Sequence, residues 1–194
     1  MTPQILILAA GASSRMRGAD KLLERVEGQP LLTRITKAAL ATGARVTVTL
    51  PPDRPLRTAA LDGLNVTTVL VPGAATGMAA SLKAGFAALP ENTAVLLLLA
   101  DLPEITADDL TLMLREWQAT PDLILRGTAA DGTPGHPVCL PAWCRPEIAN
   151  LTGDEGARSL LVRHRDRLRL IALPGSHATT DLDTPEDWAA WRSR

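Results

Sequence analysis

The residues best suited to chemistry lie near the amino terminus, where an apolar run gives way to a set of cations. Residues 9–11 have little or no side chain, so a ligand could approach their backbone N–H groups closely. Arg15, Arg17 and Lys21 follow, and only Asp20 opposes them, which gives a local charge of +2 in a chain of net charge −1. Backbone donors beside Arg and Lys suit a polyphosphate. A solvated loop would have the same composition, so the residues alone leave both interpretations open.

The spacing of this segment excludes two common phosphate-binding loops. It has no Gly-Lys-Ser/Thr ending, which a P-loop requires, and no Gly-x-Gly-x-x-Gly, which a dinucleotide-binding loop requires. Any phosphate site here must therefore be of another type.

Carboxylates stand at two positions where they could face such a loop. Asp101 follows the most apolar run of the chain, where an isolated carboxylate is costly unless it is paired, hydrated or bound to a metal. The alternative role for Asp101 is to cap a helix that begins near Thr106. Asp181 and Asp183 precede Thr184, and acidic residues beside a helix start are favourable without any metal.

Two further positions combine small or rigid residues with a polar side chain. Gly77 and Ser81 flank the first turn of an expected helix, where a ligand could bind, although small residues for packing explain the same pattern. His136 precedes Pro137 in an irregular segment, and a lone histidine is more often structural than catalytic.

The elements that must position these residues alternate along the chain. Short, continuously apolar runs are typical of parallel strands that are covered on both faces. The expected strands are Gln4–Ala9, Arg45–Leu50, Val66–Val71, Ala94–Leu99, Leu123–Arg126 and Leu168–Leu173. The expected helices are Pro30–Thr42, Arg54–Leu61, Gly77–Leu89, Thr106–Gln118, Ala157–Arg165 and Thr184–Arg192. This order predicts an α/β fold, a single three-layer Rossmann-like domain over residues 1–194 with a mostly parallel sheet.

One stretch interrupts the alternation. Gly127–Pro141 contains several glycines and prolines, which predicts a loop with a short extended piece. A loop of that length in a compact domain usually has a function.

Composition narrows the function classes. Hydrophobic residues make up 46% and charged residues 21% of 194, a globular composition. The near-zero net charge, one Phe and no Tyr argue against a nucleic-acid partner. No apolar run is long enough to cross a membrane, and two cysteines fit a reduced, cytoplasmic setting.

The chain resembles a known family through several motifs in a common order. Leu-Ala-Ala-Gly-x-Ser-x-Arg-Met followed by Lys21 looks like the signature loop of nucleotidyltransferases that activate small phosphorylated molecules, here one residue longer because of Arg17 and Gly18. Within that superfamily the chain resembles the molybdenum cofactor cytidylyltransferase branch. The other matching motifs are Gly77–Gly85, Leu99–Pro103, Gly135–Val138, Gly153–Arg158 and Asp181–Asp187.

The resemblance implies a fold like that of the nucleotide-diphospho-sugar transferases and three sets of site residues. The nucleotide-binding set is Leu8, Ala9, Ala10, Gly11, Gly77 and Ser81. The catalytic set is Arg15, Lys21 and Asp101, with Mg²⁺ held by Asp101 and one of Asp181 and Asp183, of which we favour Asp183. The acceptor-binding set is His136, Pro137 and Arg158. An ion pair of Arg158 with Asp154 or Glu155 is the alternative role for that residue.

The implied reaction is transfer of CMP from CTP to a pterin-type molybdenum cofactor with release of pyrophosphate, and a client molybdenum enzyme could receive the product. The loop reads Leu-Ala-Ala-Gly like the cytidylyl branch, whereas guanylyl-transferring relatives tend to show Leu-Ala-Gly-Gly. Two alternatives stay open: a nucleotidyltransferase that uses CTP or GTP on another small phosphorylated acceptor, and a non-catalytic cofactor-binding maturation factor.

Overall fold

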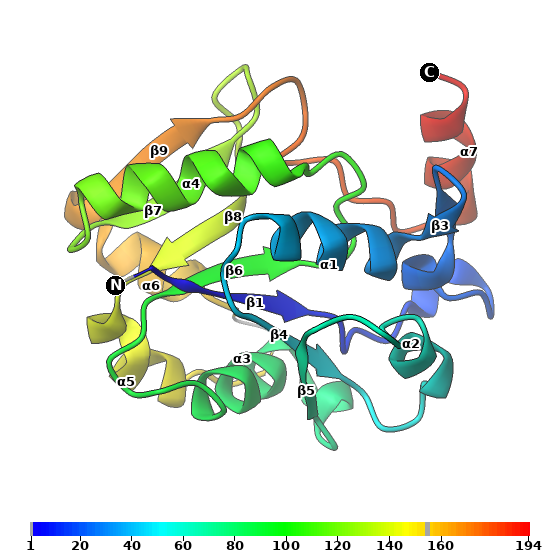
Figure 1. Cartoon of the computed structure of the whole chain (residues 1–194), viewed down its shortest axis with the longest axis horizontal. Coiled ribbons are helices and arrows are strands. Elements are labelled where there is room, and N and C mark those ends of the chain that lie inside the picture. The colour runs from blue at the N-terminus through cyan, green and yellow to red at the C-terminus, as the bar shows by residue number, and fades with distance from the viewer. Residues whose placement is uncertain (1, 154–155) are drawn as a thin grey trace.

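A seven-stranded sheet forms the centre of the molecule (Figure 1). The computed structural model describes residues 2–153 and 156–194. The strands of the sheet are β1 (Gln4–Leu8), β4 (Val46–Leu50), β5 (Thr67–Leu70), β6 (Val95–Leu99), β7 (Ile124–Thr128), β8 (Pro134–Leu140) and β9 (Leu168–Ala172). Their order is β5-β4-β1-β6-β8-β7-β9, and β8 runs antiparallel to both of its neighbours. The expected α/β fold with a mostly parallel sheet is confirmed.

Helices cover both faces of this sheet. They are α1 (Leu31–Ala41), α2 (Pro55–Ala59), α3 (Met78–Ala87), α4 (Ala107–Ala119), α5 (Arg145–Ala149), α6 (Arg158–Arg163) and α7 (Pro185–Arg192). In β1, Ile5 and Ile7 belong to the core under α1 and α4, while Leu6 and Leu8 belong to the core under α3, α5 and α6. Because both faces are covered, the strand is apolar at every position from Ile5 to Leu8 rather than at alternate ones.

Helix α3 packs very closely on the sheet. Gly85 of α3 lies so near β1 that a Cβ there would stand 2.6 Å from a methyl group of Leu6. Gly85 lies in the last turns of α3 and Leu6 in the middle of β1, so this contact packs the carboxyl-terminal half of the helix against the strand.

The prediction for Gly127–Pro141 was wrong. Most of this stretch belongs to β7 and β8, which form a hairpin. Its prolines sit where a missing N–H costs little: Pro134 begins β8, and Pro137 lies at an irregularity between the paired residues Pro134 and Val138. The sequence analysis also did not identify α5 or the small hairpin of β2 (Arg25–Val26) and β3 (Gln29–Pro30).

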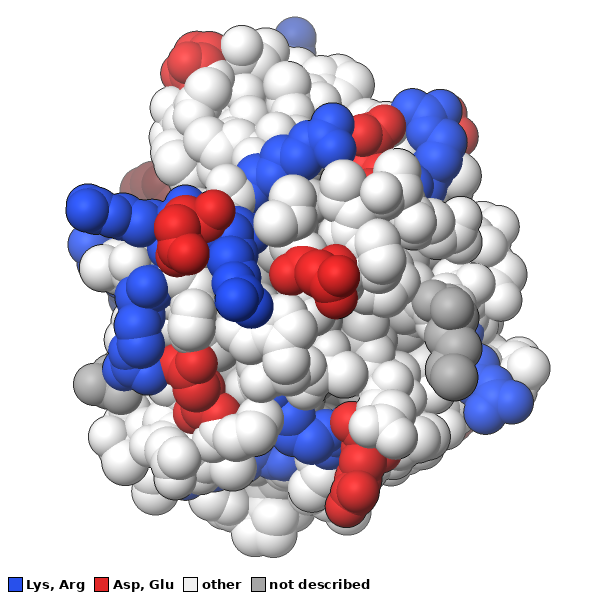
Figure 2. Space-filling view, turned by 90° about the vertical axis from the view of Figure 1, so that its left-hand side faces the viewer, with Lys and Arg blue, Asp and Glu red and all other residues white. Residues whose placement is uncertain are grey.

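The surface is consistent with the small net charge. On the face seen in Figure 2, basic and acidic side chains lie beside one another, with wide uncharged areas between them. Among the described residues, none of the helices combines the length and hydropathy needed to cross a bilayer.

Candidate functional site

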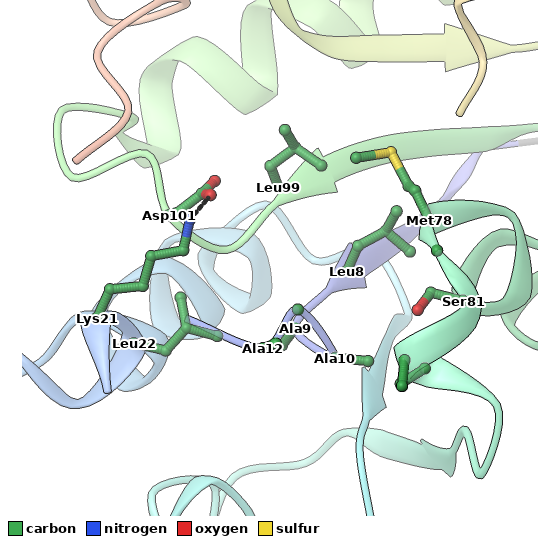
Figure 3. Close-up of a pocket in the computed structure, with 14 residues that line it drawn as sticks. Leu8, Ala9, Ala10, Ala12, Lys21, Leu22, Met78, Ser81, Leu99 and Asp101 are labelled. Carbon is green, nitrogen blue, oxygen red and sulfur yellow. Dashed lines mark hydrogen bonds and ion pairs between the residues drawn. The ribbon is translucent and has the colours of Figure 1, made fainter. Parts of the chain in front are cut away.

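A cavity of about 300 Å³ opens at the carboxyl ends of β1 and β6. In an open α/β sheet this edge is where ligands bind. All six predicted nucleotide-binding positions line the cavity: Leu8, Ala9, Ala10, Gly11, Gly77 and Ser81. Figure 3 shows Lys21 extended toward Asp101 on one side and Met78 and Ser81 on the other. A Cβ on Gly11 would meet nothing within 4 Å, so its missing side chain leaves room for a ligand rather than for packing.

The loop after β1 is held in shape by a buried arginine of α2. Arg57 is fully buried, and its guanidinium donates to the carbonyl oxygens of Ala9 and Gly11 at 2.6 and 2.8 Å. It also donates to Ser13 Oγ at 3.0 Å and to both oxygens of Asp20 at 2.7 and 2.9 Å. With these carbonyl and carboxylate oxygens occupied by Arg57, the loop has a fixed path around the cavity.

Asp20 connects the Arg57 guanidinium to the turn that carries Lys21. Its carboxylate accepts from the backbone N–H of Leu22 at 3.1 Å and so caps the 3₁₀ turn Lys21–Leu23. Burial favours the neutral acid, but the contacts with Arg57 outweigh it and lower the pKa of Asp20. Asp20 therefore stays ionised and fixes the turn from which Lys21 extends.

Lys21 joins the two carboxylates that the sequence singled out. Its ammonium lies 2.5 Å from Asp101 Oδ2 and 2.7 Å from Asp183 Oδ1. Burial disfavours the charged ammonium, but the two carboxylates outweigh that effect and raise the pKa of Lys21. Arg15 binds the other oxygen of Asp183 at 2.8 Å and is largely exposed at the mouth of the site. The structure thus brings the predicted catalytic residues together.

The same carboxylates fit a divalent cation. Asp101 Oδ1 is buried and has no hydrogen-bond partner among the described residues, so this oxygen has a free lone pair for a ligand. Mg²⁺ takes one or two carboxylates and completes its shell with phosphate and water oxygens. The described residues contain no group of three or more His, Cys, Asp and Glu side chains placed for a metal.

Of the two candidates near α7, Asp183 rather than Asp181 contacts Lys21. Burial raises the pKa of Asp181, and the neighbouring charges of Asp183 and Asp101 add to the effect. The carboxylates of Asp101, Asp181 and Asp183 therefore repel one another unless a cation lies between them.

A second cavity of about 460 Å³ adjoins the first. Its walls include Arg126 of β7, His136 of β8 and Arg158 at the start of α6, together with apolar side chains. Met78, which is 39% exposed, lines both cavities. The predicted acceptor residues His136 and Arg158 thus share a pocket, whereas Pro137 is buried and is not part of its lining. The alternative partners of Arg158, Asp154 and Glu155, lie outside the described residues.

Comparison with known proteins agrees with this geometry. Residues 5–168 match the model of the MobA-like NTP transferase domain. The chain belongs to the MobA-like NTP transferase family. A "probable molybdenum cofactor guanylyltransferase" of Nostoc sp. (strain PCC 7120) is 30% identical over 95% of this chain and 87% of that protein.

Solved structures share the fold of this NTP transferase over their whole length. The crystal structure of Rv0371c from Mycobacterium tuberculosis H37Rv has 27% identity and a TM-score of 0.83, with 100% of each chain covered. A nucleotidyl transferase from Methanothermobacter thermautotroptrophicus has 22% identity and a TM-score of 0.79, with 99% of this chain and 96% of that chain covered.

Three site residues of this NTP transferase were missed by sequence reasoning: Arg57, Met78 and Arg126. Arg57 lies in α2, far along the chain from the loop that it braces, and nothing in its sequence neighbourhood marks it. Met78 lies inside a motif that the resemblance had flagged, so that motif was the available signal. Arg126 is a single cation inside an expected strand, which is itself a signal because charged residues are costly there.

His136 gives the NTP transferase a pH dependence that can be measured. Burial and the Arg126 guanidinium lower its pKa to about 4, although Asp101 opposes the shift. The unfolded chain, with a histidine pKa of 6.5, then binds the proton more tightly. We expect the free energy of unfolding to fall by roughly 3 kcal/mol as pH drops from 6.5 to 4 through this group.

Urea unfolding of the wild type and of His136→Asn at pH 7, 5.5 and 4.5 tests this expectation. The variant should lose less stability across that range because Asn does not bind a proton. Equal losses in the two proteins would show that His136 does not titrate as described.

Proposed function

We propose that this NTP transferase moves CMP from CTP to the terminal phosphate of a molybdopterin-type cofactor and releases pyrophosphate. The observation that carries the proposal is that two unlike cavities share Met78 as a lining residue. One has the small-residue loop, Lys21 and Asp101, as a nucleotide triphosphate requires. The other has apolar walls with Arg126 and Arg158, as a flat ring with an anionic group requires.

In this proposal each part of the chain has a separate task. The loop of residues 8–11 and the first turn of α3 receive the nucleotide, with Ser81 near the base. Arg158 pairs with the acceptor phosphate, and His136 orients the acceptor. His136 is neutral at physiological pH because its pKa is lowered to about 4.

The reaction needs no covalent enzyme intermediate. An oxygen of the acceptor phosphate attacks the α-phosphorus of CTP, the new P–O bond forms, and the bond to the β-phosphate breaks with its electron pair leaving on pyrophosphate. Arg15 and Lys21 balance the charge that develops on the phosphoryl oxygens and on the leaving group. Asp101 and Asp183 would hold Mg²⁺, which when bound neutralises phosphate charge and orients the chain of phosphates.

The proposed acceptor and the proposed nucleotide are supported by different observations. The relative from Nostoc is named for the molybdenum cofactor, which supports a pterin-type acceptor here. That name also specifies guanylyl transfer, so GTP is the second candidate nucleotide. CTP is favoured by Ala10, which is 4% exposed and whose methyl group lies on the wall of the cavity, where glycine would leave more room for a larger base.

Pyrophosphate release with CTP or GTP, Mg²⁺ and molybdopterin tests the proposal. We expect kcat/KM for CTP to exceed that for GTP by about tenfold, within the range that one methyl group can produce. Ala10→Gly should lower the ratio of kcat/KM for CTP to kcat/KM for GTP. Ala12→Gly, which removes a methyl group elsewhere in the loop, should leave that ratio unchanged. A wild-type preference for GTP would overturn the nucleotide assignment, and no pyrophosphate release with either would favour a non-catalytic maturation factor.

A further inference from the structure

Glu104 connects the loop that carries Asp101 to the segment that carries Asp183, and it lines neither cavity. It follows Asp101 by three residues in the loop from β6 to α4. Its side chain is 19% exposed and accepts three hydrogen bonds from other side chains. The donors are Ser176 Oγ at 2.7 Å, Thr180 Oγ1 at 3.0 Å and Trp191 Nε1 at 2.9 Å.

These donors bracket Asp183 in the sequence. Ser176 and Thr180 precede it, and Trp191 follows it in α7. One carboxylate therefore holds both ends of the segment that carries Asp183 against the loop that carries Asp101. The distance between the two aspartates depends on that connection.

The charge of Glu104 suits this task. Burial opposes ionisation, but the hydrogen bonds from Ser176, Trp191 and Thr180 outweigh it and lower the pKa of Glu104. An ionised carboxylate is an acceptor only, so it can satisfy all three donors at once. A glutamine has one acceptor oxygen and an NH₂ group, so it must either lose the bond from Trp191 or reverse the two bonds from the hydroxyls of Ser176 and Thr180.

Other contacts hold the same segment independently. His177 binds Asp109 at 2.8 Å, and the backbone N–H of His136 donates to the carbonyl of Ala178 at 2.8 Å. Gly135 packs so closely on Ala178 that a Cβ would stand 1.9 Å from its carbonyl oxygen. Loss of the Glu104 contacts should therefore loosen the segment near Asp183 without unfolding the protein.

We propose that Glu104 is a positioning residue that sets the Asp101–Asp183 pair at the separation a divalent cation requires. The inference rests on the proposed function, because that function places the cation at these two aspartates. Glu104 acts through the hydroxyl groups and the indole that it holds, and it touches neither substrate nor metal. Residues that orient metal ligands in this way typically change metal affinity by about 10–100-fold when they are replaced.

Mn²⁺ binding to the nucleotide-free protein tests the proposal without a measurement of enzyme activity. The EPR signal of the free ion reports how much Mn²⁺ is bound. Mn²⁺ takes the same oxygen ligands as Mg²⁺. Glu104→Gln should weaken Mn²⁺ binding by about tenfold or more, while CTP binding measured in EDTA stays within about twofold of the wild type. Thr180→Val, which removes one donor and keeps the shape, should give a smaller weakening.

Two controls separate the possible failures. Glu116→Gln in α4 removes a carboxylate that binds only Arg115 and Arg169 among the described residues, and it should leave Mn²⁺ binding unchanged. Asp101→Asn should weaken Mn²⁺ binding strongly. If Asp101→Asn does so and Glu104→Gln does not, the role of Glu104 is wrong and the proposed function stands. If Asp101→Asn also has no effect, the metal site of the proposed function fails, and this inference fails with it.

Discussion

Replacement of Lys21 by alanine is expected to lower kcat by about 10²–10³-fold while changing the Kd for CTP far less. A cation that acts mainly on charge developing in the transition state contributes about 3–4 kcal/mol to the barrier. Lys21 is 13% exposed. It lines both the 300 Å³ cavity of the candidate site and a smaller cavity of about 170 Å³ that Arg15 also lines. Steady-state pyrophosphate release and equilibrium CTP binding measure the two quantities separately.

The matched control is Lys37→Ala, because Lys37 is an exposed cation of α1 that binds Gln29. It should leave kcat unchanged. For the same Lys21→Ala variant we also expect a gain: Mn²⁺ should bind the nucleotide-free variant more tightly than the nucleotide-free wild type. The ammonium and a divalent cation use the same two carboxylates, and without the ammonium these repel one another. Near-normal turnover of Lys21→Ala would contradict its catalytic role.

Replacement of Arg57 by methionine is expected to destabilise the protein by about 3–5 kcal/mol. Removal of Arg57 takes the nearest cation from Asp20, whose side chain is 9% exposed, and leaves Arg54 at 3.9 Å as its remaining cationic partner. The carbonyl oxygens of Ala9 and Gly11 lose their donor at the same time. The free energy of unfolding in urea gives the magnitude, and CTP binding at a temperature where the variant is folded should be weakened as well.

Two comparisons make the Arg57 result specific. Arg115→Met removes an exposed arginine that pairs with Glu116, and it should change stability by less than about 1 kcal/mol. A double variant, Arg57→Met with Asp20→Asn, should recover part of the loss because it no longer contains a buried carboxylate that has lost its nearest cation. If Arg57→Met and Arg115→Met cost the same, the guanidinium does not brace the loop.

Sequence patterns predicted the parts of this structure that depend on local signals. Apolar runs identified the parallel strands most clearly at the centre of the sheet, because burial on both faces of β1 and β6 leaves almost no polar positions there. The capping boxes of α4 and α7 could be read from Thr106 and Thr184, each followed three residues later by an aspartate. Asp101 could be selected as a site residue because a carboxylate at the end of a buried strand is costly without a partner. Lys21 could be selected because it is a cation that follows a loop of small residues.

The features that local patterns missed depend on contacts between distant segments. β8 could not be recognised because its glycines and prolines are tolerated only through the irregular pairing with β7. Arg57 and Glu104 look like ordinary surface charges in the sequence, and only the fold brings them to the partners that they hold. The resemblance favoured Asp183 over Asp181, but the contact of Asp183 with Lys21 depends on the path of the segment before α7, which local patterns do not specify.

A crystal structure with CTP and Mg²⁺ tests the central claim most directly. The account predicts the triphosphate on the loop of residues 9–15, Mg²⁺ on Asp101 and Asp183, and the Lys21 ammonium moved from these carboxylates to the phosphates. A nucleotide bound elsewhere, or one bound in this cavity with Lys21 still joined to both aspartates and no metal beside them, would contradict it.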